Sequence, residues 1–263
     1  MTGFRAGSTG SLTEVAGLRS KSGQGDATPK SATAVRKPAR SARGEKARAR
    51  LKAAALVVLE RDGYHKMRIA DVTGEAGVAA GLFYHYFDDL KSLTIEVLED
   101  FVAHSLQIEA IEKNVPRGDW YGRMLAHNRL VAATYAQRPG LTRCLLQLSD
   151  EDEAFSRLLR QNFIQQLNWL VVQMPKLFPE ARLDDHQSLM VVYTLAGMGE
   201  TLLRDYYVNR EPALLAEPLA VDDIAELLTV MFYRGLFLEN PPPQKLRYTR
   251  GLLHMVRADG DAG

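Results

Sequence analysis

The sequence has 263 residues, of which 46% are hydrophobic and 25% are charged, a composition typical of a soluble globular protein with a sizeable core. The single cysteine, Cys144, excludes an internal disulfide and favours a reducing, cytoplasmic compartment. The first residues lack the apolar region of a secretory signal. The longest apolar stretch, Leu189 to Leu203, is interrupted by Glu200 and is shorter than the roughly 20 residues of a membrane helix. We therefore expect no membrane span.

Charge is distributed unevenly along the chain. Residues 1–52 contain 12 Lys or Arg and 3 Asp or Glu, a net charge of +9, which leaves −8 for the remainder of a chain whose total is +1. Residues 1–44 are rich in small, polar and basic residues, so we expect a disordered basic arm. Such an arm is attracted to phosphate groups, and Arg40, Arg43, Arg48 and Arg50 are candidates for that contact. A solvated tail without a partner is the alternative.

After the arm, apolar residues recur with the period of an α-helix. Leu51, Ala55 and Leu59 share one face of a first helix, which Gly63 ends. Two short helices are expected over 69–76 and 80–87, joined by a turn at Gly77-Val78-Ala79. Asp89 is a suitable N-cap for a further helix that reaches Phe101.

The rest of the chain repeats this helical pattern, and proline or glycine residues mark the expected helix ends. No convincing strand alternation is present, which predicts an all-α fold. We expect a three-helix helix-turn-helix DNA-binding domain followed by a larger helical ligand-binding and dimerisation domain. The later helices are expected over 119–137, 141–148, 153–174, 185–208 and 221–238. The expected domains are the arm (1–44), the DNA-binding domain (45–101), the helical domain (102–240) and a C-terminal tail (241–263).

Two short helices joined by a glycine-containing turn are the helix-turn-helix pattern, whose second helix can enter the major groove of DNA. The residues expected to face DNA are Gly81, Leu82, Tyr84 and His85, with Phe83 and other apolar residues packed behind them. An ordinary helical hairpin is the alternative interpretation of the same pattern.

The sequence around this hairpin resembles the TetR (tetracycline-repressor-like) family. The register runs without a gap from Leu51 to Phe87, and the closing Tyr-His-Tyr-Phe string is the most specific part. The resemblance implies a homodimeric, ligand-responsive transcriptional regulator that binds double-stranded operator DNA, as a repressor. The matching segments are Leu51–Ala55, Gly63–Tyr64, Ile69–Val72, Ala76–Val78 and Gly81–Phe87.

The sequence departs from the family pattern at four positions. Ala79 stands where the family usually has a capping Ser or Thr, and Ala80 stands where a polar residue is common. Arg68 replaces a Thr and could hold a phosphate, while Leu90 replaces a Lys that Lys91 follows directly. The DNA-binding residues that the resemblance implies are Arg68, Gly81, Leu82, Tyr84, His85 and Lys91.

The resemblance assigns effector binding and dimerisation to the larger helical domain, with the helices over 185–208 and 221–238 pairing across the dimer. A mainly apolar or aromatic effector is expected, because the candidate pocket residues are apolar with a few polar anchors. A phosphate-bearing thioester is the alternative, and it would need an inward arginine such as Arg129, Arg143 or Arg157. Plain core packing is the alternative for each pocket residue. The candidate residues are Trp120, Met124, His127, Asn128, Tyr135, Phe163, Gln166 and Trp169.

Enzyme motifs are weak in this sequence, and we expect neither catalysis, nor a metal, nor a cofactor. The six histidines lack metal-ligand spacing, and Gly197-Met198-Gly199 is no phosphate loop because no strand precedes it. Cys144 with His127 could form a nucleophile pair, but a lone helical cysteine usually packs as a small core residue. An all-α enzyme or ligand carrier with a vestigial helix-turn-helix is the alternative, and retention by DNA distinguishes the two.

Overall fold

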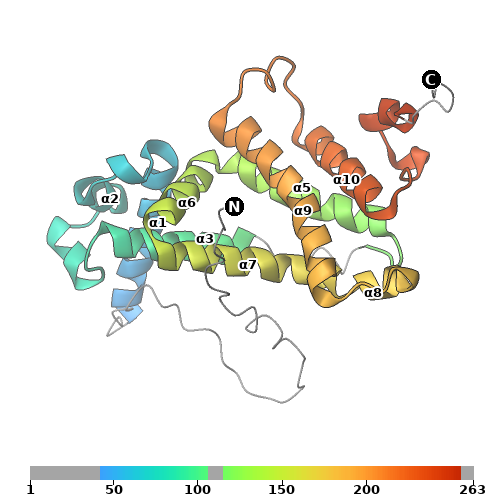
Figure 1. The fold of residues 1–263 in the computed structure, drawn as a ribbon. Helices are drawn as coiled ribbons and strands as arrows, with labels where there is room; N and C mark the ends of the chain where they lie inside the picture. The colour runs from blue at the N-terminus through green and yellow to red at the C-terminus, as the bar shows by residue number, and fades with distance from the viewer. Residues whose placement is uncertain (1–41, 106–114, 256–263) are drawn as a thin grey trace, which may run out of the picture. The chain divides into compact units, whose positions relative to one another are not determined.

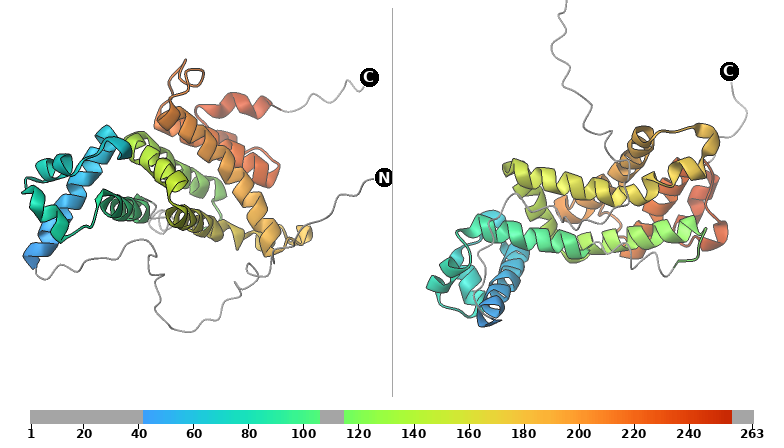
Figure 2. Two further views of the ribbon diagram at one scale, coloured as in Figure 1. Left: turned by 60° about the vertical axis from the view of Figure 1, so that its left-hand side comes forward. Right: turned by 90° about the horizontal axis from the view of Figure 1, so that it is seen from below.

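The computed structural model describes residues 42–105 and 115–255, all within one compact unit. These residues form helices, turns and loops without a strand, so the all-α fold is confirmed for them (Figure 1). Most of the expected basic arm and the last eight residues lie outside the described part of the chain. In Figures 1 and 2 the helices of the N-terminal part gather at one end of this unit, and α9 and α10 lie at the other.

Three helices and two short 3₁₀ segments form the N-terminal part. Gly63, with φ of 82°, follows the first helix, and Gly77, with φ of 61°, follows the second, because both positions need a backbone conformation that glycine adopts without strain. The side chains of Leu51, Val72 and Phe83 are fully buried in the shared core. The elements are α1 (Ala42–Asp62), η2 (Tyr64–Lys66), α2 (Ile69–Ala76), η3 (Ala80–His85) and α3 (Leu90–Ser105).

The remaining helices form the larger part of the unit. Asp119, Asp152 and Asp184 cap three of them, each accepting a backbone N–H from the first turn. The elements are α5 (Trp120–Gln137), α6 (Pro139–Glu151), α7 (Glu153–Val171), α8 (Met174–Leu177), η4 (Pro179–Ala181), α9 (Asp185–Leu203), η5 (Arg204–Asn209), α10 (Val221–Phe237), η6 (Pro243–Lys245) and η7 (Thr249–His254).

Two expected helix ends are wrong because proline begins helices here. Pro139 occupies the first turn of α6, which therefore begins at residue 139 instead of 141. The helix also runs on to Glu151, past the expected end at residue 148. Pro175 likewise lies in the first turn of α8, whereas α7 has already ended at Val171. Proline is tolerated in a first turn because the N–H that it lacks has no partner within the helix there.

Residues 241–255, part of the expected C-terminal tail, pack against α10. Glu226, buried on that helix, accepts hydrogen bonds from the backbone N–H groups of Arg247 and Thr249 and from the Thr249 hydroxyl. Leu246 beside them is fully buried. This carboxylate therefore holds the segment in place through charge-assisted hydrogen bonds.

The N-terminal helices meet the larger part where α1 contacts the start of α6. The Glu60 carboxylate accepts hydrogen bonds from the backbone N–H groups of Gly140 (3.1 Å) and Leu141 (2.9 Å). These N–H groups lie in the first turn of α6 and have no partner inside that helix. A Cβ on Gly140 would lie 2.1 Å from the Glu60 backbone oxygen, so this contact requires glycine.

We expect Gly140→Ala to lower the free energy of unfolding by about 3 kcal/mol, because the added methyl group would force two backbones apart. Gly74→Ala is the matched control, since a Cβ at this helical position meets nothing within 4 Å, and it should stabilise the protein by about 0.5 kcal/mol. Chemical unfolding followed by circular dichroism measures both changes. Equal stability of the two variants would contradict the close contact of α1 with α6.

Candidate DNA-binding and ligand-binding sites

The candidate DNA-reading segment is η3. Tyr84 is 58% exposed, Gly81 and His85 are also exposed, and Leu82 is half-buried. Phe83 is fully buried on the opposite side. With three residues per turn, Gly81 lies beside Tyr84 and Leu82 lies beside His85 on the outer surface. This segment thus presents one aromatic hydroxyl and one imidazole to solvent.

The structure corrects the expected α-helix over 80–87. The segment is a 3₁₀ helix that ends at His85, and the N–H of Leu82 donates to the oxygen of Ala79 at 2.9 Å. Ala79 makes no side-chain cap, because a methyl group has no acceptor for the first N–H groups. The alanine that departs from the family pattern therefore stands at the start of a short, tightly wound segment.

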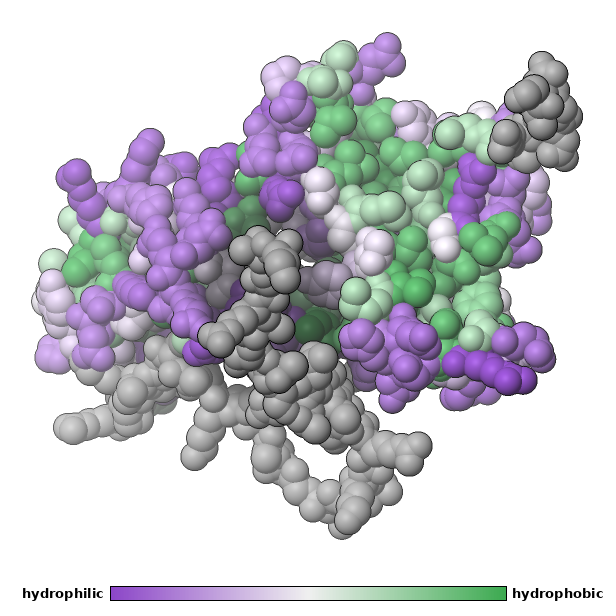
Figure 3. All heavy atoms as spheres, in the orientation of Figure 1, coloured by the Kyte–Doolittle hydropathy of each residue, from purple (hydrophilic) through white to green (hydrophobic). Residues whose placement is uncertain are grey.

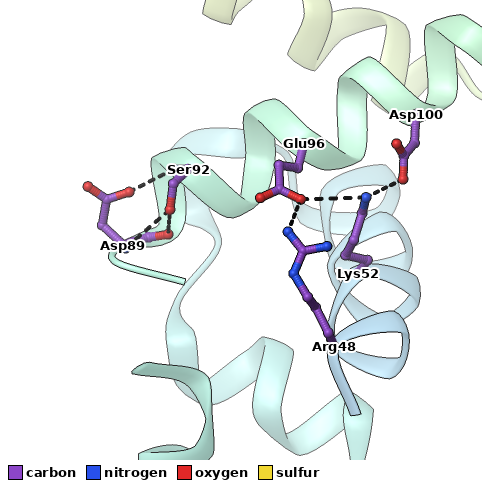
Figure 4. Close-up of polar contacts among 6 residues, drawn as sticks. All are labelled: Arg48, Lys52, Asp89, Ser92, Glu96 and Asp100. Carbon is purple, nitrogen blue, oxygen red and sulfur yellow. Dashed lines mark hydrogen bonds and ion pairs between the residues drawn. The ribbon is translucent and has the colours of Figure 1, made fainter. Parts of the chain in front are cut away.

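A partly buried ionic network joins α1 to α3 in the same N-terminal part (Figure 4). Arg48 on α1 pairs with Glu96 on α3, and Lys52 pairs with Asp100 and lies 3.7 Å from Glu96. The Arg48 guanidinium also lies 5.0 Å from the centre of the Phe87 ring. Asp89 caps α3 by accepting the N–H of Ser92 at 2.7 Å.

Two arginines that were expected to contact DNA phosphates have structural roles instead. Arg48 and Arg50 both lie within α1, which begins at Ala42, and Arg48 is buried in the network described above. Arg50 donates to the backbone oxygens of Ala76 and Gly77, at the turn between α2 and η3. These two side chains therefore position the helix-turn-helix.

The two basic side chains expected at DNA differ in their surroundings. Arg68 is exposed at the N-terminus of α2, where a phosphate would also meet the positive end of the helix dipole. Lys91 lies 2.7 Å from the carboxylate of Asp152, the residue that caps α7. This hydrogen bond raises the pKa of Lys91 and lowers the pKa of Asp152. Lys91 is thus tied to the larger part of the protein.

The larger part contains a cavity of about 230 Å³ lined mainly by apolar and aromatic side chains. Residues from α3, α5, α6, α7, α9 and α10 contribute to its wall. Of the candidate pocket residues, Trp120 does not line the cavity. Its ring stacks on Trp169, with the ring centres 6.5 Å apart and the planes at 11°. The candidate residues in the wall are Met124, His127, Asn128, Tyr135, Phe163, Gln166 and Trp169.

Few polar groups face this cavity. Asn128 donates to the Thr229 hydroxyl at 3.0 Å, whereas the Nδ1 atom of His127 is buried without a partner. Burial lowers the pKa of His127 to about 4, so its ring is neutral at pH 7. Tyr135 donates a hydrogen bond to the carboxylate of Glu200 on α9.

Glu200 was missing from the candidate residues. Burial raises the pKa of its carboxyl group, while the hydrogen bond from Tyr135 and the charge of Arg204 oppose that rise. The sequence did contain a signal for it, because Glu200 is the only charged residue within the apolar stretch from Leu189 to Leu203. A charged side chain among apolar residues at a cavity wall is costly unless it has a partner, which marks such a position for function.

The three arginines that could have bound a phosphate-bearing thioester in the pocket have other partners. Arg129 pairs with Asp222 at 3.1 Å, and Arg157 pairs with Glu153 on the same helix. Arg143 donates to the backbone oxygen of Val208. No Lys or Arg belongs to the cavity wall formed by the described residues. This part of the chain also has neither a helix apolar and long enough to cross a membrane nor a cluster of metal-binding side chains.

Residues 51–97, from α1 to the middle of α3, match the family described as "Bacterial regulatory proteins, tetR family". The resemblance is confirmed. No curated protein sequence matches the chain.

Solved structures share the fold of this chain. A TetR-family transcriptional regulator from Bordetella parapertussis 12822 is 18% identical, with a TM-score of 0.54 over 75% of this chain and 100% of that one. A protein from Pseudomonas aeruginosa PAO1, assigned as a transcriptional regulator, is 19% identical, with a TM-score of 0.56 over 71% and 88%. Another, from Saccharomonospora viridis in complex with choline, is 17% identical, with a TM-score of 0.53 over 70% and 94%. The TetR-like fold therefore extends beyond residues 51–97.

We expect the neutral, buried His127 to make the protein less stable as the pH falls. Its pKa is about 4 in the folded protein against 6.5 when exposed, so the unfolded chain binds the proton first. Between these values the free energy of unfolding should fall by up to about 1.4 kcal/mol per pH unit. His127→Gln should reduce the slope measured by urea unfolding, and His254→Gln, at an exposed position, is the control. Equal slopes in all three proteins would contradict a buried neutral imidazole.

Proposed function

We propose that this protein is a DNA-binding transcriptional regulator whose operator affinity is controlled by a small molecule. The observation that carries the proposal is the exposed surface of η3 within a TetR-type N-terminal region. Tyr84 and His85 can donate to phosphate oxygens or base edges, and Leu82 can contact a thymine methyl group. Arg68 adds a phosphate contact at the start of α2.

Dimerisation through α9 and α10 fits the exposed apolar side chains on these helices. Met190 and Met198 are 53% and 49% exposed on α9, and Met231 is 44% exposed on α10. Hydrophobic residues gather over this region of the face drawn in Figure 3. The two helices pack closely where Gly199 meets Leu228 and Gly235 meets Leu195. A second copy covering this face would bring two η3 segments to one operator, as helix-turn-helix dimers do.

The cavity supports the effector part of the proposal. Its apolar wall suits a mainly apolar or aromatic molecule. α6, whose first turn donates hydrogen bonds to Glu60 of α1, contributes Thr142 and Leu145 to that wall. The choline complex of the Saccharomonospora viridis protein means that a related fold holds a small organic molecule. A ligand that displaces α6 or α3 would move the DNA-binding helices and release the operator, the behaviour of a repressor.

The combined variant Tyr84→Ala and His85→Ala is expected to reduce specific DNA binding by at least about a hundredfold, because it removes both polar groups from the outer surface of η3. Operator sites are first selected from genomic fragments with the wild-type protein, and fluorescence anisotropy then measures affinity. Unfolding should be unchanged, since both side chains are exposed.

The matched control is Tyr248→Ala with His254→Ala, which removes the same two residue types from exposed positions in the C-terminal segment. It should bind the selected sites like the wild type. If both double variants bind equally well, η3 is not the reading segment. If the wild-type protein is not retained by DNA at low salt, the ligand-carrier alternative gains support.

Met190→Glu is expected to weaken dimerisation by at least about tenfold, because the carboxylate would lie unpaired in an apolar interface. Met190 is preferable to Leu228, which also lines the cavity. Val57→Glu on α1, where valine is 41% exposed, is the control for adding a charge to an apolar surface position. Sedimentation equilibrium measures both, and a folded Met190→Glu protein that stays fully dimeric would reject this interface.

A further inference from the structure

We infer that the cavity binds a compact organic monocation, with its positive charge beside the Glu200 carboxylate and its apolar part against the aromatic wall. This names the effector class, and it rests on the proposed function only in treating the cavity as the effector site. The first argument is charge. Glu200 is an acidic residue in the wall, while no Lys or Arg of the described chain lines it. A cation is therefore the ligand charge that this wall complements.

The second argument is the incomplete pairing of Glu200 within the protein. Among the described residues, Glu200 accepts a side-chain hydrogen bond from Tyr135, a neutral donor. Arg204, which follows on the next turn, is half-exposed and lies 3.8 Å from Asp205. A buried carboxylate usually has a cationic partner or several donors, because its desolvation is otherwise uncompensated. A bound cation would supply that partner.

The third argument is the composition of the wall. Trp169, Phe163 and Tyr135 line the cavity with Glu200, and Phe101 and Phe232 complete its aromatic part. The faces of aromatic rings carry partial negative charge and attract cations, most strongly where water is excluded. An anion would meet the Glu200 carboxyl group with no Lys or Arg in the described cavity wall to pair with it. The same wall therefore favours a cation and disfavours an anion.

The inference predicts a proton release. Burial raises the Glu200 pKa in the free protein, and a cation beside the carboxylate lowers it again. At a pH where Glu200 carries a proton in the free protein, binding breaks the carboxyl O–H bond and transfers the proton to the solvent, so cation affinity rises with pH until Glu200 is ionised. Of the other titratable groups near it, His127 and Tyr135 on α5 are uncharged at neutral pH, because burial lowers the pKa of His127 and raises the pKa of Tyr135. Arg204 lies beyond the end of α9. The wall residues from α7 and α10 carry no titratable group.

Benzyltrimethylammonium and neopentylbenzene form a matched pair of probes, because the quaternary nitrogen of the first is a carbon atom in the second. Calorimetric titration of the full-length protein should give an affinity at least about tenfold higher for the cation. Glu200→Gln should remove most of this difference while binding neopentylbenzene like the wild type. Glu217→Gln, at an exposed loop position, is the control and should change neither affinity.

A second variant covers the case in which Glu200→Gln does not fold. Tyr135→Phe removes the hydrogen bond that favours the ionised carboxyl group, so it should weaken cation binding and move its pH dependence to higher pH. Titrations in buffers of different ionisation enthalpy detect the released proton. Equal affinity for the two probes, preference for the anion phenylacetate, or no binding of the cation would overturn the inference.

These outcomes are separate from those of the DNA experiment. A protein that prefers the cation but is not retained by DNA would reject the proposed regulator and leave the cavity chemistry intact. A protein that binds selected operator sites with no preference for the cation would reject the inferred cation site and leave the proposed regulator intact.

Discussion

The contact between Glu60 and the first turn of α6 is the constraint on which the rest of the arrangement depends. Two backbone N–H groups of α6 donate to this one carboxylate, and Gly140 allows the two backbones to touch. The negative charge also lies at the positive end of the α6 dipole. α6 then contributes Leu145 to the cavity wall and Cys144 to the core behind α1. The N-terminal helices and the cavity are thereby joined through α6, in addition to the direct contribution of α3 to the cavity wall.

The sequence predicts those features that depend on neighbours in the chain. Apolar residues with helical spacing, the glycines after α1 and α2 and the Asp89 cap of α3 are local signals, and each is present in the structure. The helix-turn-helix could be found in this way because its residues are contiguous. The candidate cavity residues on α5 and α7 followed from composition, since amphipathic helices must turn aromatic side chains inward.

Partners that are distant in the sequence could not be predicted. From the sequence, Arg48 was expected to contact DNA phosphates, but in the structure it pairs with Glu96 of α3, 48 positions later. The sequence predicted that Lys91 contacts phosphate, but in the structure it forms an ion pair with Asp152 at the start of α7. Trp120 and Trp169 read as equivalent pocket residues, but stacking leaves only Trp169 in the cavity wall. In each case the neighbour that decides the role comes from another helix, which periodicity within one helix does not reveal.

The position of the cavity indicates how effector binding and operator binding would be coupled thermodynamically. Its wall includes Phe101 of α3, Leu145 of α6 and the exposed Met198 and Met231 of the apolar face on α9 and α10. One bound molecule would thus contact the helices that carry the DNA-binding region and those proposed to hold the dimer. Linkage requires that a ligand which lowers operator affinity by a given factor is itself bound more weakly, by the same factor, on the operator. The operator-bound protein would therefore have a lower affinity for the effector than the free protein. As a result, operator affinity and the effector concentration needed for release cannot be set independently.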